Sequence, residues 1–157
     1  MEFVEYQKTL DLEELKAETA GADAVIIANM PYPSSVISSC DTLKFIDVAF
    51  TGTDHVGLDA AREKGISVSN ASGYSNEAVS ELVLGMVLSF MRNISQVETR
   101  CREGKDKTGL VGCEVKGKTV GIIGLGKIGK RTAEIFNCLG ATVLASSRTK
   151  HLSLIHI

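Results

Sequence analysis

Residues 119–145 read T-V-G-I-I-G-L-G-K-I-G-K-R-T-A-E-I-F-N-C-L-G-A-T-V-L-A, and this stretch decides the fold. It opens with the β-branched run 119–123 and continues with the glycine turn 124–129. Side chains at helical spacing follow, before Gly140 ends the pattern: Ile128, Thr132, Ile135, Phe136 and Leu139. Residues 142–145 then predict a second strand. Strand, glycine turn, helix and strand in this order are typical of one βαβ unit.

The glycine turn has the spacing G-x-G-x-x-G, in which each glycine has its own role. Gly124 permits the tight turn, Gly126 lets the backbone approach a pyrophosphate, and Gly129 lets the helix pack close to the strand. The helix that starts at Lys127 and Ile128 offers free N–H groups and the positive end of its dipole to phosphates. The pattern predicts a dinucleotide site, and the alternative is a glycine turn that binds nothing. Lys127 faces either the pyrophosphate or water.

Composition narrows the classes of partner. The chain has 157 residues, a hydrophobic content of 44% and a net charge of −2, which gives no reason to expect nucleic acid or an anionic membrane. The longest apolar run, 82–90, is too short to span a bilayer. The four cysteines show no C-x-x-C spacing, and we expect reduced thiols in a cytoplasmic protein.

The first part of the chain repeats βα units. Strands are expected at 3–6, 24–28, 43–49 and 66–69, and helices at 10–19, 34–39 and 58–64. The continuous apolar strand at 24–28 is typical of a parallel sheet that is buried on both faces. Ligands bind beyond the carboxyl ends of such strands, so the candidate site loops are 29–30, 51–53 and 70–75.

A long helix is predicted at 76–102, and a charged connection at 104–118 leads into the βαβ unit. The first half of this helix is apolar on all sides, which indicates that it is buried between two domains or in a dimer interface.

Four motifs in order identify a family resemblance: G-T-D-H-V at 52–56, G-I-S-V-S-N at 65–70, A-V-S-E at 78–81 and G-K-T-V-G-I-I-G-L-G-K-I-G at 117–129. Over about residues 2–150 the chain resembles the D-isomer-specific 2-hydroxyacid dehydrogenases, the group of phosphoglycerate dehydrogenases and glyoxylate/hydroxypyruvate reductases. The resemblance implies the α/β class: a flavodoxin-like parallel-sheet substrate domain (1–95), then the first βαβ of a Rossmann NAD(P)-binding domain (96–151). Gly57 departs from the Asp common in the family, and Ser80 from the usual Ala.

The resemblance also implies hydride transfer between a nicotinamide and a 2-hydroxy or 2-keto acid, and a homodimer. Thr51 and Gly52 match the loop whose N–H groups hold the substrate carboxylate, although each alone could be an ordinary turn. Tyr74 matches a loop aromatic near the substrate, or else is a half-buried packing residue. The family's catalytic Arg, Glu and His have no counterparts here, since the only histidines are His55, His151 and His156. We therefore expect no catalytic residue in this chain and no activity from it alone.

The end of the second strand bears on the choice between NAD and NADP. NAD-binding proteins usually carry an Asp or Glu there, whereas this chain has Ser147 and Arg148. Arg148 can pair with a 2′-phosphate and Ser147 can donate to it, which favours NADP over NAD. The alternative is that Arg148 is solvated and NAD binds without the acidic contact.

Residues 152–157, Leu-Ser-Leu-Ile-His-Ile, match one translated frame of a common sequencing adapter. We therefore expect this segment to be an adapter-derived artefact and the chain to be a fragment, the alternative being a natural terminal strand. Two other functions stay open at this point. One is a dinucleotide-sensing corepressor or regulatory binding protein of the same fold, and the other is a chain with no function of its own.

Overall fold

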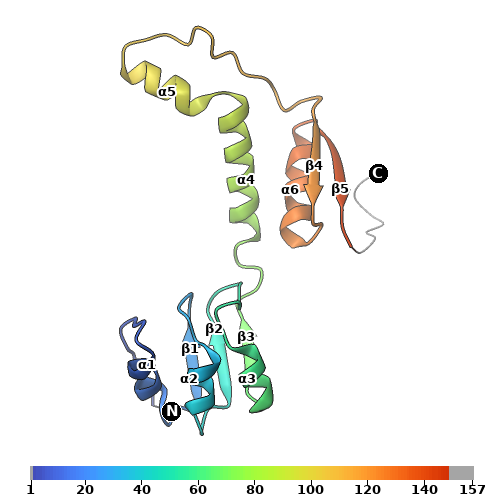
Figure 1. Ribbon diagram of the computed structural model, residues 1–157. Coiled ribbons are helices and arrows are strands. Elements are labelled where there is room, and N and C mark those ends of the chain that lie inside the picture. The colour runs from blue at the N-terminus through green and yellow to red at the C-terminus, as the bar shows by residue number, and fades with distance from the viewer. Residues whose placement is uncertain (1, 149–157) are drawn as a thin grey trace. The chain divides into compact units, whose positions relative to one another are not determined.

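The computed structural model describes residues 2–148 (Figure 1). The adapter-like segment 152–157 and the histidines His151 and His156 lie outside the described residues. The chain forms two compact units, which divide between Tyr74 and Ser75. The sequence analysis places the domain boundary at residue 95 instead, within the long helix predicted at 76–102, and that domain assignment stays a prediction.

The first unit contains a parallel sheet in the order β1-β2-β3. Its strands are β1 (Ala24–Ile27), β2 (Phe45–Val48) and β3 (Ser67–Asn70), and the helices of the unit are α1 (Leu12–Thr19), α2 (Ser34–Ser39) and α3 (Leu58–Glu63). Ile27 pairs with Val48 and Val48 with Asn70, so all three strands end at the same edge. This edge is where the candidate loops of the first unit begin.

The core of the first unit is formed by apolar residues of its helices, its strands and the loops between them. Tyr32, Val36, Ile37, Ile46 and Val48 are completely buried. At the start of α1, Asp11 accepts hydrogen bonds from the N–H groups of Glu13 and Glu14, as its place before the helix predicts.

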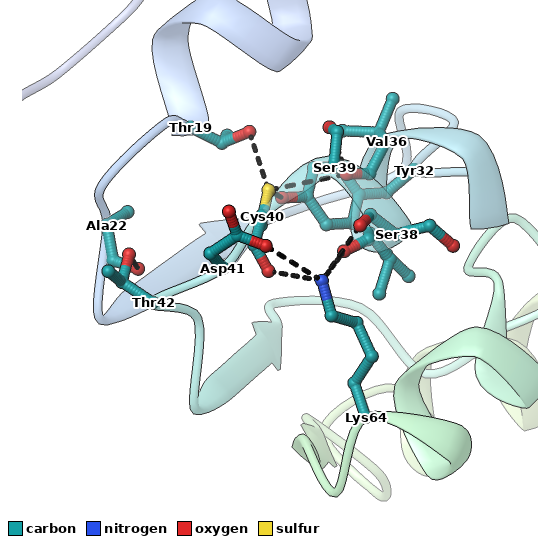
Figure 2. Close-up of polar contacts among 11 residues, drawn as sticks. Thr19, Ala22, Tyr32, Val36, Ser38, Ser39, Cys40, Asp41, Thr42 and Lys64 are labelled. Atoms are coloured by element: carbon teal, nitrogen blue, oxygen red, sulfur yellow. Dashed lines mark hydrogen bonds and ion pairs between the residues drawn. The ribbon is translucent and has the colours of Figure 1, made fainter.

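Lys64 and Cys40 tie α2 to its surroundings (Figure 2). The Lys64 ammonium donates to the carbonyls of Ser38 (2.8 Å), in the last turn of α2, and of Cys40 (2.6 Å), the residue after it. A cation there satisfies carbonyls that the helix leaves unpaired. The buried Cys40 thiol lies 3.4 Å from the Thr19 hydroxyl and donates to the Val36 carbonyl.

One expected strand is absent from the first unit. The segment 3–6 is irregular, and Phe3, Val4 and Tyr6 are 76%, 58% and 53% exposed. That prediction is wrong, because alternation over four residues forms a strand only where a neighbouring strand pairs with it.

The second unit contains α4 (Asn76–Met91), α5 (Ile94–Arg102), β4 (Thr119–Ile123), α6 (Lys127–Cys138) and β5 (Thr142–Ser146). β4 and β5 pair in parallel, as the βαβ pattern predicts. The core gathers around Phe136 and Val143, with Val83 and Val87 of α4 packed against it. Together with the first sheet, this pair confirms the α/β class.

The long helix predicted at 76–102 is two helices. Asn93 adopts a left-handed conformation with φ 54°, and α4 and α5 meet there at a bend of 62°. Asparagine takes this conformation more readily than most residues, which is the physical reason for the break. Within residues 2–148 no helix is long and apolar enough to cross a membrane alone, and only the bent pair of α4 and α5 reaches that length and composition.

α4 is also less buried than its composition predicts. Val83, Leu84, Val87, Leu88 and Met91 pack against the core of the second unit. The opposite stripe is exposed: Leu82 by 62%, Met86 by 63% and Phe90 by 85%. Within the second unit the helix is therefore covered on one side only, and its burial between two domains or in a dimer interface stays a prediction.

Candidate functional site

The glycine turn between β4 and α6 has the geometry of an anion site. Gly124 has φ +94°, a conformation that strains any residue with a side chain. Gly126 precedes the first turn of α6 with extended backbone (φ −73°, ψ −167°). The N–H groups of Lys127, Ile128 and Gly129 have no partner among the described residues. They lie at the positive end of the 12-residue helix, where a phosphate binds favourably.

The other two glycines differ in the space around them. A Cβ atom on Gly129 would overlap the carbonyl oxygen of Gly124 and lie 3.5 Å from Cγ2 of Ile122. A Cβ atom on Gly126 would meet no protein atom within 4 Å. Gly129 is thus required by the packing of the protein, whereas Gly126 leaves open space in front of the turn. That space is what a pyrophosphate needs.

Ser147 and Arg148 follow β5 directly and are exposed. The Gly124 N–H donates to the Ser146 carbonyl at 2.8 Å, so the ladder between β4 and β5 continues into the turn. This hydrogen bond fixes the end of β5 beside the glycine turn. The described end of β5 carries no carboxylate: it reads Ala145, Ser146, Ser147 and Arg148.

Behind the turn, two polar links hold α6 against α4. The completely buried Ser80 hydroxyl oxygen lies 2.8 Å from the Asn76 carbonyl and 3.3 Å from the Ile128 carbonyl, which share its one proton, and it accepts from the Thr132 hydroxyl (3.3 Å). Arg131 forms ion pairs with Glu77 at 2.7 Å and Glu134 at 3.0 Å. The Ser80 link acts on the first turn of α6, so this departure from the family's usual Ala supports the segment that carries the free N–H groups.

In the first unit, Thr51 and Gly52 lie in the loop that follows β2. The Phe50 carbonyl accepts from the Ala71 N–H (3.1 Å), and the Thr51 carbonyl accepts from the Asn70 side chain (2.7 Å). Both carbonyls therefore point toward the end of β3. A trans peptide carries its C=O and N–H on opposite sides, so the Thr51 and Gly52 N–H groups both point away from β3. Neither N–H has a partner among the described residues. Two adjacent N–H groups that point in the same direction can both donate to one anionic oxygen.

Tyr74 is the last residue of the first unit, and its side chain is 64% exposed. Its hydroxyl forms no hydrogen bond with the described residues. The alternative of a half-buried packing tyrosine does not fit this exposure, and its role near a substrate stays a prediction.

The sequence analysis names Asn70 and His55 but does not predict the contacts that they make in these loops. Asn70 donates to the Thr51 carbonyl, and a ring nitrogen of His55, Nε2, lies 2.8 Å from the Ala28 carbonyl. The signal for Asn70 is its place at the end of β3, because asparagine at a strand end often bonds to nearby backbone. For His55 no pattern in the sequence indicates a partner 27 residues away.

The comparisons with known proteins agree with the geometry. The family model described as D-isomer specific 2-hydroxyacid dehydrogenase, catalytic domain, matches residues 1–154. A hydroxypyruvate reductase of Blautia hydrogenotrophica is 32% identical over 162 aligned positions, which cover 98% of this chain and 50% of the relative. A D-3-phosphoglycerate dehydrogenase of Methanocaldococcus jannaschii is 35% identical over 143 positions, with 90% and 27% covered. This chain thus spans half the length of the first relative and about a quarter of the second.

Solved structures of other reductases and dehydrogenases also match this chain. An acyclic imino acid reductase in complex with NADPH and D-Arg superposes with a TM-score of 0.85 at 27% identity, over 92% of this chain and 48% of that one. A D-lactate dehydrogenase from Aquifex aeolicus, complexed with NAD and lactic acid, has a TM-score of 0.81 at 27% identity, over 88% and 43%.

Proposed function

The chain belongs to the family of D-isomer-specific 2-hydroxyacid dehydrogenases. From this premise we propose that the protein is an NAD(P)-dependent oxidoreductase. The proposed reaction is hydride transfer between the nicotinamide and a small 2-hydroxy or 2-keto acid. This chain supplies the groups that hold the dinucleotide and the substrate carboxylate. We assign no acid–base residue to it. No observation favours the alternative of a dinucleotide-sensing corepressor.

The observation that carries the proposal is the contrast between Gly126 and Gly129. Space is left open at Gly126, where a ligand must approach, and is closed at Gly129, where the helix must pack. The N–H groups of Lys127, Ile128 and Gly129 would hold the pyrophosphate. The nicotinamide, when bound, supplies or accepts the hydride. The residues of this chain bind and orient the dinucleotide.

We propose NADP as the preferred cofactor over NAD. The support is the position of Ser147 and Arg148 beside the glycine turn, fixed by the hydrogen bond between Gly124 and Ser146. A guanidinium pairs with a 2′-phosphate, and no carboxylate at the described end of β5 would repel it. The two solved relatives named above contain NADPH in one case and NAD in the other.

For the substrate we propose that the Thr51 and Gly52 N–H groups donate hydrogen bonds to the carboxylate, with Tyr74 near the bound acid. Fixed backbone donors suit an anion because they need no titratable group and no reorganisation. We also propose a homodimer. Its support is the exposed stripe of Leu82, Met86 and Phe90 on α4, since apolar side chains in a continuous row favour contact with another surface.

Titration with NADPH and NADH, followed by the fluorescence of the reduced nicotinamide, tests the cofactor assignment. We expect both to bind and NADPH to bind more tightly. Arg148→Ser should weaken NADPH about ten-fold and leave NADH unchanged, because only the 2′-phosphate contact is lost. The control is Arg102→Ser, which removes the same charge from the exposed face of α5. Failure of both nucleotides to bind would contradict the proposed function, and equal loss in the two arginine variants would contradict the NADP preference.

A further inference from the structure

We propose that Asn70 is a positioning residue for the substrate carboxylate. Its side-chain amide holds the Thr51–Gly52 peptide in the orientation that presents the Gly52 N–H to the anion. The inference rests on the proposed role of Thr51 and Gly52 in holding that carboxylate. It adds the residue that decides which way their N–H groups point.

The end of β3 places Asn70 against the loop that follows β2. Asn70 is the last residue of β3 and pairs with Val48, the last residue of β2. The next N–H along the chain, that of Ala71, donates to the carbonyls of Val48 (3.0 Å) and Phe50 (3.1 Å). This backbone bond fixes the Phe50–Thr51 peptide. It does not reach the Thr51–Gly52 peptide, which is the next one along.

The Asn70 amide is the group that fixes the second peptide. Its Nδ2 atom donates to the Thr51 carbonyl oxygen at 2.7 Å, a short hydrogen bond. No other described group bonds to that carbonyl. Because the peptide is planar, holding the carbonyl on one side holds the Gly52 N–H on the other.

Gly52 makes such a tether necessary. A peptide that precedes glycine can rotate to the opposite orientation at little cost, since glycine adopts positive and negative φ angles about equally readily. Without the Asn70 donor, the Gly52 N–H would sample both directions. The two N–H groups would then point the same way for only part of the time.

His55 provides a matched control, because it makes the same kind of contact at another carbonyl. Its Nε2 lies 2.8 Å from the Ala28 carbonyl and so ties the loop after β2 to the end of β1. Loss of either contact loosens the same loop. Only loss of the Asn70 contact frees the Thr51–Gly52 peptide.

The experiment uses the 157-residue chain labelled with ¹⁵N and ¹³C, and pyruvate as the probe. The variants are Asn70→Leu and His55→Leu, each of which replaces a polar side chain with an apolar one. Without pyruvate, Asn70→Leu should shift the Thr51 carbonyl ¹³C and Gly52 ¹⁵N resonances, and His55→Leu should leave both in place. With pyruvate, the Thr51 and Gly52 amides of the unaltered chain should move. Asn70→Leu should then weaken binding about ten-fold, the cost of one donor to a charged group, and His55→Leu less than two-fold.

The two proposals fail in different ways. If the unaltered chain responds to pyruvate and Asn70→Leu binds it equally well, the positioning role is overturned and the carboxylate site stands. If pyruvate moves neither amide, the assignment of Thr51 and Gly52 to the carboxylate is overturned, and the positioning role with it. Equal weakening by the two variants would also overturn the inference, because the contact would then only keep the loop in place.

Discussion

The α-carbon of Gly129, in the first turn of α6, lies so close to the carbonyl oxygen of Gly124 that no side chain fits between them. This contact joins the end of β4 to the start of α6 and sets how closely the helix packs on the strand. Its effect is to aim the first N–H groups of α6 at the space in front of Gly126.

Gly129→Ala should therefore destabilise the second unit. The added methyl group overlaps a backbone oxygen, which cannot move without shifting β4 or α6. Such overpacking typically costs about 1–3 kcal/mol. Thermal unfolding and hydrogen exchange of residues 119–146 measure the loss. An unchanged midpoint would show that the helix can move away from the strand at little cost.

Gly126→Ala should instead leave the stability nearly unchanged and weaken nucleotide binding. Its Cβ meets no protein atom, so stability should stay within about 0.5 kcal/mol of the original chain. Binding of NADPH or NADH should fall by ten-fold or more, because the methyl group occupies the space of the pyrophosphate. Denaturation and nicotinamide fluorescence on the same sample give both values. Tight binding by this variant would show that the pyrophosphate lies elsewhere.

Gly57 stands where the family commonly has Asp, and restoring that residue should harm this chain. A Cβ atom on Gly57 would overlap the backbone N and Cα of Ser34, the first residue of α2. An Asp could cap α3 for about 1 kcal/mol, but overlap with backbone costs about 1–3 kcal/mol, so Gly57→Asp should lower the melting temperature. Gly52→Ala is the stability control, since its Cβ makes only an ordinary contact. A rise in melting temperature for Gly57→Asp would mean that α2 moves aside freely.

Lys64→Met should destabilise the first unit by about 2 kcal/mol, because charged hydrogen bonds to carbonyls at the C-terminal end of α2 are lost. The methionine keeps most of the apolar stem. The control is Lys44→Met, which breaks an exposed ion pair with Asp23 at 2.6 Å and should leave the melting temperature nearly unchanged. Similar melting temperatures for the two variants would show that the ammonium of Lys64 contributes no more than a surface charge.

Tyr32 should make the first unit sensitive to alkaline pH. Burial raises the pKa of its hydroxyl well above the usual value of about 10, so the folded chain keeps a proton that the unfolded chain loses. The stability that this group contributes is complete below about pH 10 and is lost as pH rises further, by up to about 1.4 kcal/mol per pH unit. Tyr32→Phe should reduce that slope between about pH 10 and 11.5. Urea unfolding at several pH values measures it, and parallel slopes would exclude Tyr32 as the cause.

Much of the fold could be predicted because its signals are local. The βαβ unit at 119–146 and the helix at Ser34–Ser39 follow from spacing and turn residues, and both are confirmed. The flavodoxin-like and Rossmann expectation is confirmed by the solved relatives. The errors arise where the outcome depends on distant partners. Residues 3–6 have no strand to pair with, and the break at Asn93 depends on one backbone conformation within a helical pattern.

The sequence by itself determined the order of the elements, the family and the glycine turn, because each depends on neighbours within a few residues. Only the tertiary structure decided which groups meet across the chain. It brought Asn70 to the Thr51 carbonyl, Ser80 to the first turn of α6, and Ser34 against Gly57. These contacts join residues 19, 48 and 23 positions apart, and no periodic pattern encodes such pairs. They form because parallel strands end at one edge of their sheet and because α4 packs on α6.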